Sequence, residues 1–178
     1  MNLKELIDLY HHMEWADASV WRALLNSPDA VNDQKLHEYF HHLHLVQRAF
    51  LRAWRNEPAD APYPTFATAS ELMLWGQSYF SELFTHLQNL SDDQLATAAQ
   101  LPWAEIVTSQ LGRPPEPLTF GEMMLQVPLH SLYHRGQINA RLRAVGGVPP
   151  TVDYIVWVWL GRPKADWNFE VKSNGTGF

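Results

Sequence analysis

Apolar residues recur along four stretches of the chain with the 3.6-residue period of an amphipathic helix. These stretches cover residues 3–24, 36–54, 68–87 and 119–145. The last two open with the capping-box pattern, Thr68 with Glu71 and Thr119 with Glu122, which marks a helix start. The pattern predicts an all-α fold with four long helices.

The segments between these stretches predict how the helices are connected. Residues 57–66 are rich in proline and form a linker, whereas residues 101–120 form a long crossover with a short hairpin in it. Residues 151–161 are expected to form a short packing helix, and the chain after about residue 165 a loosely packed tail. We therefore predict a single domain over residues 1–178, a four-helix bundle with one long crossover and a short C-terminal helix.

Composition and charge narrow the class of protein. Hydrophobic residues make up 46% of the chain, enough for a packed core. The net charge of −6, without a cluster of lysine and arginine, argues against nucleic acid as a partner. The longest apolar run, YIVWVWL, is too short to cross a membrane and no signal peptide is evident, so a cytoplasmic protein is expected. The absence of cysteine leaves His, Asp and Glu as candidate metal ligands.

The fourth helical stretch places two histidines, His130 and His134, in its apolar stripe. Residues four apart lie on one face of a helix, so both imidazoles can reach one ion. Burying each ring without a partner would cost a few kcal/mol. A divalent metal removes this cost because it binds neutral ring nitrogens. The alternative interpretation is two core histidines bonded to backbone groups or to each other.

A third ligand would come from the second helical stretch, which contains HEYFHHLH at residues 37–44. His42 lies one turn from the stripe residues Tyr39 and Val46, and His44 lies on a more polar edge. We therefore prefer His42 as the third ligand and keep His44 as the alternative.

The same stretch contains a literal match to the His-Glu-x-x-His motif of zinc metallopeptidases, with His37, Glu38 and His41. On a helix, His37 and His41 lie about 120° and about 170° from the predicted core direction. A peptidase would need that pair at the floor of a cleft, so we disfavour this interpretation. Ordinary positions near helix surfaces are expected for the remaining histidines, His11, His12 and His86.

Taken together, the motifs resemble those of the DinB/YfiT-like superfamily of bacterial four-helix proteins. The resemblance rests on HSLYHRGQI late in the chain, HHLHLVQRAFLRAW on the second helix, MEWADASVW on the first, and the closing GGVPPTVDYIVWV. It covers nearly the whole chain, and HRGQ after a spaced histidine is its most specific part.

The resemblance implies a bundle that holds one divalent metal ion by three histidines. Carried over by position, the ligands are His42, His130 and His134. It also implies a homodimer and relatives that are thiol-dependent S-transferases or isomerases using bacillithiol, mycothiol or glutathione. A small-molecule substrate, such as a low-molecular-weight thiol, is thus the expected partner.

The chain departs from the family pattern at three positions. Gln126 stands where many members have a further histidine, Tyr133 where many have His before the second ligand, and Asp17 where Asn is common. None removes a ligand, but these departures leave the substrate class open.

Two functions are therefore open. The first is a metal-dependent enzyme, an S-transferase, isomerase or hydrolase, that activates a thiol or water at an ion with open positions. The second is a non-catalytic, metal-stabilised dimeric interaction module. Three imidazoles suit zinc, nickel and iron alike, so the ion is not identified.

Three residues next to the two histidines of the fourth stretch also carry expectations. We expect Gly136 to mark close packing of a neighbouring helix, and Arg135 and Gln137 to make internal hydrogen bonds or orient a ligand.

Overall fold

A computed structural model describes residues 2–58 and 60–168, and most of these residues are helical. The four predicted helices are present as α1 (Leu3–Leu25), α3 (Gln34–Trp54), α4 (Ala69–Leu87) and α7 (Phe120–Ala144). The prediction of an all-α fold is confirmed. Both predicted capping boxes are formed, at the starts of α4 and α7.

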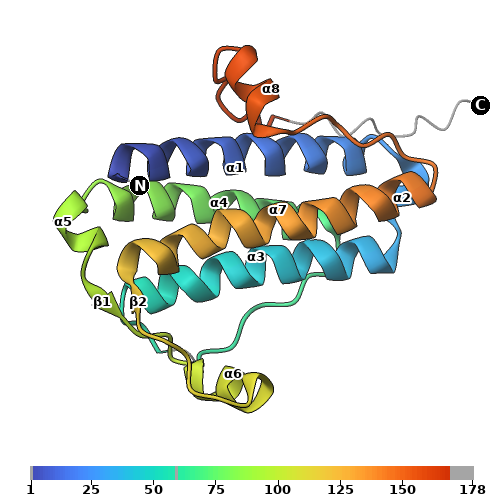
Figure 1. Cartoon of the computed structure of the whole chain (residues 1–178). Helices are drawn as coiled ribbons and strands as arrows, with labels where there is room; N and C mark the ends of the chain where they lie inside the picture. Colours follow the sequence, from blue (N-terminus) through green and yellow to red (C-terminus); the bar gives the residue numbers. More distant parts are fainter. Residues whose placement is uncertain (1, 59, 169–178) are drawn as a thin grey trace, which may run out of the picture.

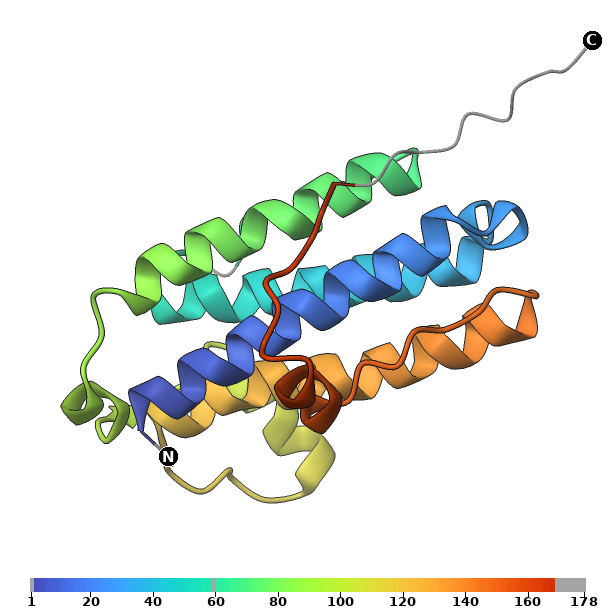
Figure 2. The ribbon, with the colours of Figure 1, turned by 90° about the horizontal axis from the view of Figure 1, so that it is seen from above.

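The four long helices lie side by side (Figure 1). α3 packs between α7 and α4, and α1 also contacts both α7 and α4. α1 and α7 run in one direction, and α3 and α4 in the other (Figure 2). Because α3 and α4 are parallel, the segment between them has to return along the length of the helices. The chain therefore has two long connections, 55–68 and 88–119, where the sequence predicted one.

Short elements complete the described chain. They are α2 (Pro28–Val31), α5 (Asp92–Leu95), α6 (Ala104–Leu111), α8 (Tyr154–Trp159), β1 (Ala98–Ala99) and β2 (Leu118–Thr119). The strands pair antiparallel, Ala98 with Thr119 and Ala99 with Leu118. The short hairpin predicted within residues 101–120 is not formed. Instead, the strand before this segment pairs with the strand at its end, and α6, which the sequence did not predict, lies between them in the chain. The predicted C-terminal helix is α8.

A tyrosine side chain replaces the backbone hydrogen bond that the proline inside α7 cannot donate. Pro128 has no N–H, so the carbonyl of Met124, four residues earlier, lacks its helical donor. The hydroxyl of Tyr10 on α1 donates a hydrogen bond to this carbonyl over 2.8 Å. Tyr10 is fully buried, and its burial raises the pKa of the phenol well above its usual value. The helix therefore continues through the proline.

The buried face of α3 contains most of the predicted apolar stripe but is rotated toward polar positions. Leu36, Leu43, Phe50 and Trp54 are buried as predicted, whereas Tyr39 and Val46 are only half-buried. Phe40, His44 and Gln47, which lie outside the predicted stripe, are buried as well. The core thus contains polar side chains at its centre, between two apolar clusters at its ends. This rotation leaves His42 at the edge of α3 that faces α7.

The C-terminal part of the described chain packs back onto α1. Trp157 of α8 is buried, and the indole N–H of Trp167 donates to Glu14 over 3.2 Å. The expectation of a loose tail after about residue 165 is therefore wrong at Trp167, and residues 169–178 lie outside the described chain. None of the helices described has the length and apolar character needed to cross a membrane.

Candidate metal centre

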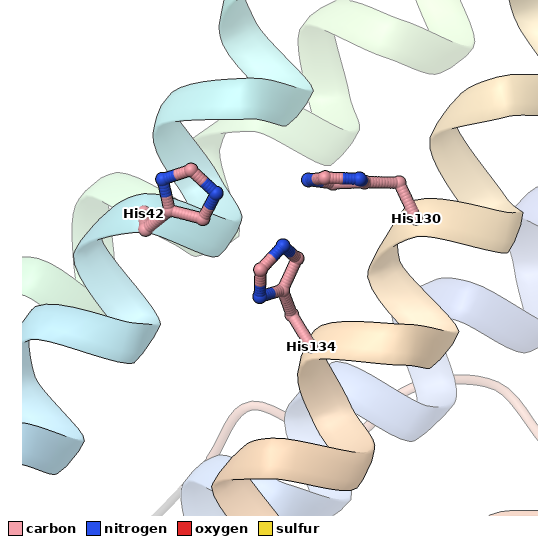
Figure 3. A group of neighbouring side chains, drawn as sticks. All are labelled: His42, His130 and His134. Carbon is pink, nitrogen blue, oxygen red and sulfur yellow. The ribbon is translucent and has the colours of Figure 1, made fainter.

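Three histidine side chains converge between α3 and α7 (Figure 3). His42 comes from α3, and His130 and His134 come from successive turns of α7. One ring nitrogen from each histidine lies within 4.8 Å of the others. Among the described residues, this is the one cluster of three or more potential ligands that could hold a metal ion. The three residues predicted from sequence are thus brought together.

The triad lies between α3 and α7 and is open on one side, although the sequence placed His130 and His134 in the apolar stripe of their helix. His42 is exposed, His130 is half-buried and His134 is only 9% exposed. The rings of His130 and His134 have centroids 4.3 Å apart, and the ring of His42 lies 4.6 Å from that of His134. The open side of the cluster is therefore the side of His42.

The ring of His134 is oriented by a neighbouring amide. Its Nδ1 lies 2.8 Å from Oε1 of Gln137, one turn later on α7, and the amide nitrogen of Gln137 donates to the hydroxyl of Tyr133. Because an amide oxygen only accepts, Nδ1 carries the proton and Nε2 keeps its lone pair for a ligand. Gln137 therefore holds His134 in the tautomer that a metal ion requires, one of the two roles expected for it.

His130 has a ring nitrogen without a partner. Its Nε2 atom is buried and makes no hydrogen bond, and such an orphaned group costs about 1–3 kcal/mol. Burial, and then the neighbouring His134 and His42, lower the pKa of His130 to about 4. Burial and His134 also lower the pKa of His42. Both rings are therefore neutral at physiological pH, which is the form that binds metal ions.

The geometry and chemistry of the three nitrogens fit a divalent ion. Nitrogens bound tetrahedrally to zinc at 2.0–2.1 Å are about 3.3 Å apart, so the nitrogens have to approach one another slightly, which rotation of the exposed His42 side chain allows. Three protein ligands leave at least one position open, as in catalytic sites rather than structural ones.

His44, the alternative ligand, does not belong to the cluster. Its Nε2 accepts a hydrogen bond from the indole of Trp21 over 2.9 Å, and its Nδ1 lies 2.8 Å from the amide oxygen of Gln47. Both ring nitrogens are therefore occupied inside the core. A Cβ atom on Gly76 of α4 would overlap the imidazole of His44. Close helix packing therefore occurs at Gly76, a position that the sequence pattern did not indicate.

Gln47 connects the hydrogen bonds of His44 to a buried ion pair between Asp17 and Arg135. Its amide nitrogen donates to Asp17 over 2.8 Å, and Arg135 donates to the other oxygen of Asp17 over 2.7 Å. Asp17 and Arg135 are 0% and 2% exposed. The prediction of internal hydrogen bonds for Arg135 is confirmed. Since Arg135 adjoins His134 in sequence, the network also fixes α7 at the level of the triad.

The metallopeptidase motif does not form a site. The Nε2 atom of His41 lies 2.9 Å from the carbonyl oxygen of Pro64, and Glu38 pairs with Lys35. His37 and His41 are half-buried rather than solvated, and His41 is covered by Pro64 and Phe66. Neither belongs to a ligand cluster among the described residues.

Two further expectations need correction. His12, expected near a helix surface, is 7% exposed, and its Nε2 lies 2.9 Å from the carbonyl oxygen of Val152. Gly136, expected against a neighbouring helix, is exposed, and a Cβ atom there would meet nothing within 4 Å. Close packing within this chain therefore does not explain Gly136. His11 and His86 stack on Phe84 and Trp54.

Comparison with known proteins gave no identification. No protein-family model matches the chain, and none of the curated proteins searched is significantly similar to it. The DinB-like assignment therefore stays a prediction from the motifs.

Proposed function

We propose that the chain is a DinB-like four-helix bundle that binds one divalent metal ion through His42, His130 and His134. In this proposal it is an enzyme that activates a thiol or water for transfer, isomerisation or hydrolysis. The observation that carries the proposal is the convergence of three imidazoles from two helices, one of them with an orphaned buried nitrogen.

Each of the three histidines would contribute to binding such an ion in a different way. His134, oriented by Gln137, provides a fixed donor, and His130 provides a neutral donor that has no other partner. His42, exposed on α3, completes the set from the opposite helix. Zinc, nickel or iron held there would act as a Lewis acid that lowers the pKa of a thiol or water at an open position.

Access to the cluster favours an enzyme over a closed structural site. His42 is exposed, and His130 also lines a groove of about 510 Å³ next to the triad. A small molecule can therefore approach the cluster from the side of His42, and the groove begins next to His130. A structural ion would instead be enclosed by four protein ligands.

Metal binding tests the proposal first. Isothermal titration of metal-free protein with Zn²⁺, Ni²⁺ or Fe²⁺ should give one site per chain in the wild type. The variant carrying His42→Ala, His130→Ala and His134→Ala should lose it. A matched control with His37→Ala and His41→Ala removes two histidines from the same helix and should bind as the wild type does. Equal binding by the triple variant would refute the proposed site.

Activity is tested on the metal-loaded protein. We expect turnover in a screen of bacillithiol, mycothiol and glutathione against electrophilic acceptors, or of hydrolysable esters and amides. The activity should disappear in the triple variant and persist in the His37 and His41 control. Metal binding without any turnover would favour the second candidate function.

The second candidate is a non-catalytic, metal-stabilised homodimeric module. It is favoured by an apolar stripe on the outer face of α7, where Leu129, Leu132 and Tyr133 are 54%, 52% and 64% exposed. Gly136 continues this stripe and would let a helix of a second copy approach closely. Sedimentation of the wild type and of Leu132→Lys tests it, since a dimer through this face should dissociate in the variant.

A further inference from the structure

We infer that the groove beside His130 binds the uncharged, apolar body of the substrate, with the reacting group at the His130 end. This inference deepens the proposed function and rests on it for the reaction, although binding in the groove can be measured without a metal ion. The groove has a volume of about 510 Å³, which suits a small organic molecule.

Three parts of the chain build the groove. α3 contributes Val46, Ala49 and Phe50. The segment between β1 and β2 covers them with Trp103 and Val107 from the start and the middle of α6. The rings of Phe50 and Trp103 meet edge to face, with centroids 5.1 Å apart. α6 buries none of its own residues completely, so lining this groove is its clearest structural role.

The third wall leads directly to the candidate metal centre. Met123, Gln126 and His130 lie at successive turns on one face of α7 and all line the groove. His134 follows one turn after His130. A molecule lying along this wall would therefore place one end at the triad and the other under α6.

The chemistry of the lining selects an uncharged ligand. Aliphatic and aromatic side chains dominate, and no lysine or arginine is among the described residues that line the groove. Its one charged group is Glu122, whose hydrogen bonds from Thr119 lower the pKa of the carboxyl and keep it ionised. An anionic ligand would lose solvation beside this carboxylate and find no cation. Gln126 provides the one uncharged polar side chain between Glu122 and His130.

A pair of dyes tests the groove on metal-free protein. N-phenyl-1-naphthylamine and 8-anilinonaphthalene-1-sulfonate share one aromatic body and differ by a sulfonate. We expect the neutral dye to bind the wild type about tenfold more tightly, measured by fluorescence titration. Tighter binding of the sulfonate would overturn the assignment of an uncharged ligand.

Variants inside and outside the groove test whether the neutral dye binds there. Ala49→Trp fills the groove and should weaken binding of the neutral dye about tenfold or more. Ala140→Trp, on an exposed position of α7 outside the groove, should bind as the wild type does. In case Ala49→Trp perturbs α3, Val107→Asp adds a charge on α6, and the exposed Ser109→Asp on the same helix is its control. Equal binding by all variants, or none by the wild type because a second copy covers the groove, would overturn the inference.

A pair of hydroxamic acids links the groove to the metal centre. On zinc-loaded protein, octanohydroxamic acid should bind more tightly than acetohydroxamic acid, by about fourfold for each methylene buried. If half of the six additional methylenes enter the groove, the ratio of affinities is about 60-fold, and it should be lost in Ala49→Trp but not in Ala140→Trp.

The two experiments separate failure of the groove from failure of the proposed function. Loss of the hydroxamate preference while zinc still binds would contradict the groove and leave the metal site standing. If zinc does not bind while the neutral dye still depends on Ala49, the metal-dependent function fails and the groove is confirmed as a binding site.

Discussion

The Nδ1 atom of His134 donates a hydrogen bond to Oε1 of Gln137 over 2.8 Å. This contact within one helix turn determines which nitrogen of His134 is available to a metal ion. The partner group that orients a ligating histidine commonly matters almost as much as the ligand itself.

Replacing Gln137 should therefore weaken metal binding without removing a ligand. Gln137→Leu should lower zinc affinity about 10- to 100-fold, because nothing then holds Nδ1 protonated and the ring in place. Gln137→Glu retains an acceptor at this position and should bind zinc at least as well as the wild type. Calorimetric titration of the three proteins checks the prediction, and unchanged affinity in Gln137→Leu would contradict it.

Two glycines should respond in opposite directions to the same substitution. Gly76→Ala would place a Cβ atom in the ring of His44 and disturb its hydrogen bonds, so unfolding should become easier by about 1–3 kcal/mol. Gly136→Ala lies in open space within a helix and should stabilise the monomer by about 0.5–1 kcal/mol. Urea denaturation at low protein concentration measures both. Destabilisation by Gly136→Ala would show that something covers this position.

The buried pair of Asp17 and Arg135 should be costly to break from one side. Either Asp17→Asn or Arg135→Met leaves a buried group without its partner, and about 3–5 kcal/mol of stability should be lost. The double variant should lose less than the sum of the two, because no isolated charge is then left. Chemical denaturation of the four proteins completes this cycle, and strictly additive losses would argue against a coupled pair.

Acid should destabilise the metal-free protein before carboxylates titrate. In the folded chain burial lowers the pKa of His130 to about 4, and burial also lowers the pKa of His44 and of His12, whereas an unfolded histidine titrates near 6.5. The unfolded state thus binds more protons between about pH 6.5 and pH 4, so stability falls as the pH is lowered through this window. Urea midpoints at pH 7.5 and pH 5 measure the loss.

A variant at His130 measures how much of the loss of stability at low pH comes from this residue. His130→Phe keeps a ring of similar shape but cannot be protonated, so its urea midpoint should depend less on pH than that of the wild type. A replacement at His37, which lies outside the triad, serves as the control. An unchanged pH dependence in His130→Phe would mean that His130 does not contribute.

The sequence pattern predicted the long helices because apolar periodicity and capping boxes are local signals. It also indicated His42, because His42 lies one turn from Tyr39 and Val46 in the predicted apolar stripe. In the structure these two residues are half-buried, and His42 lies at the edge of α3 that faces α7 (Figure 3). It could not show that the core of α3 centres on Phe40, His44 and Gln47. A count of apolar positions assigns polar residues to the surface, and only the partner residues, which are remote in sequence, show that they are buried.

Two features of the candidate site depend on distant parts of the chain. The surface position of the triad follows from that rotation of α3. The groove beside His130 exists because the strand pair Ala98–Ala99 with Leu118–Thr119 holds α6 over α3. No local pattern near Trp103 indicates this placement. The role of Gln137, in contrast, could have been found from its spacing of three residues after His134.

Zinc K-edge X-ray absorption of the zinc-loaded protein shows whether α3 and α7 share the ion. We expect a first shell of nitrogen or oxygen near 2.0–2.1 Å, with imidazole scattering from three histidines that falls to two in His42→Ala. A spectrum with fewer than three imidazoles, or one that does not change in His42→Ala, would contradict a site shared by α3 and α7.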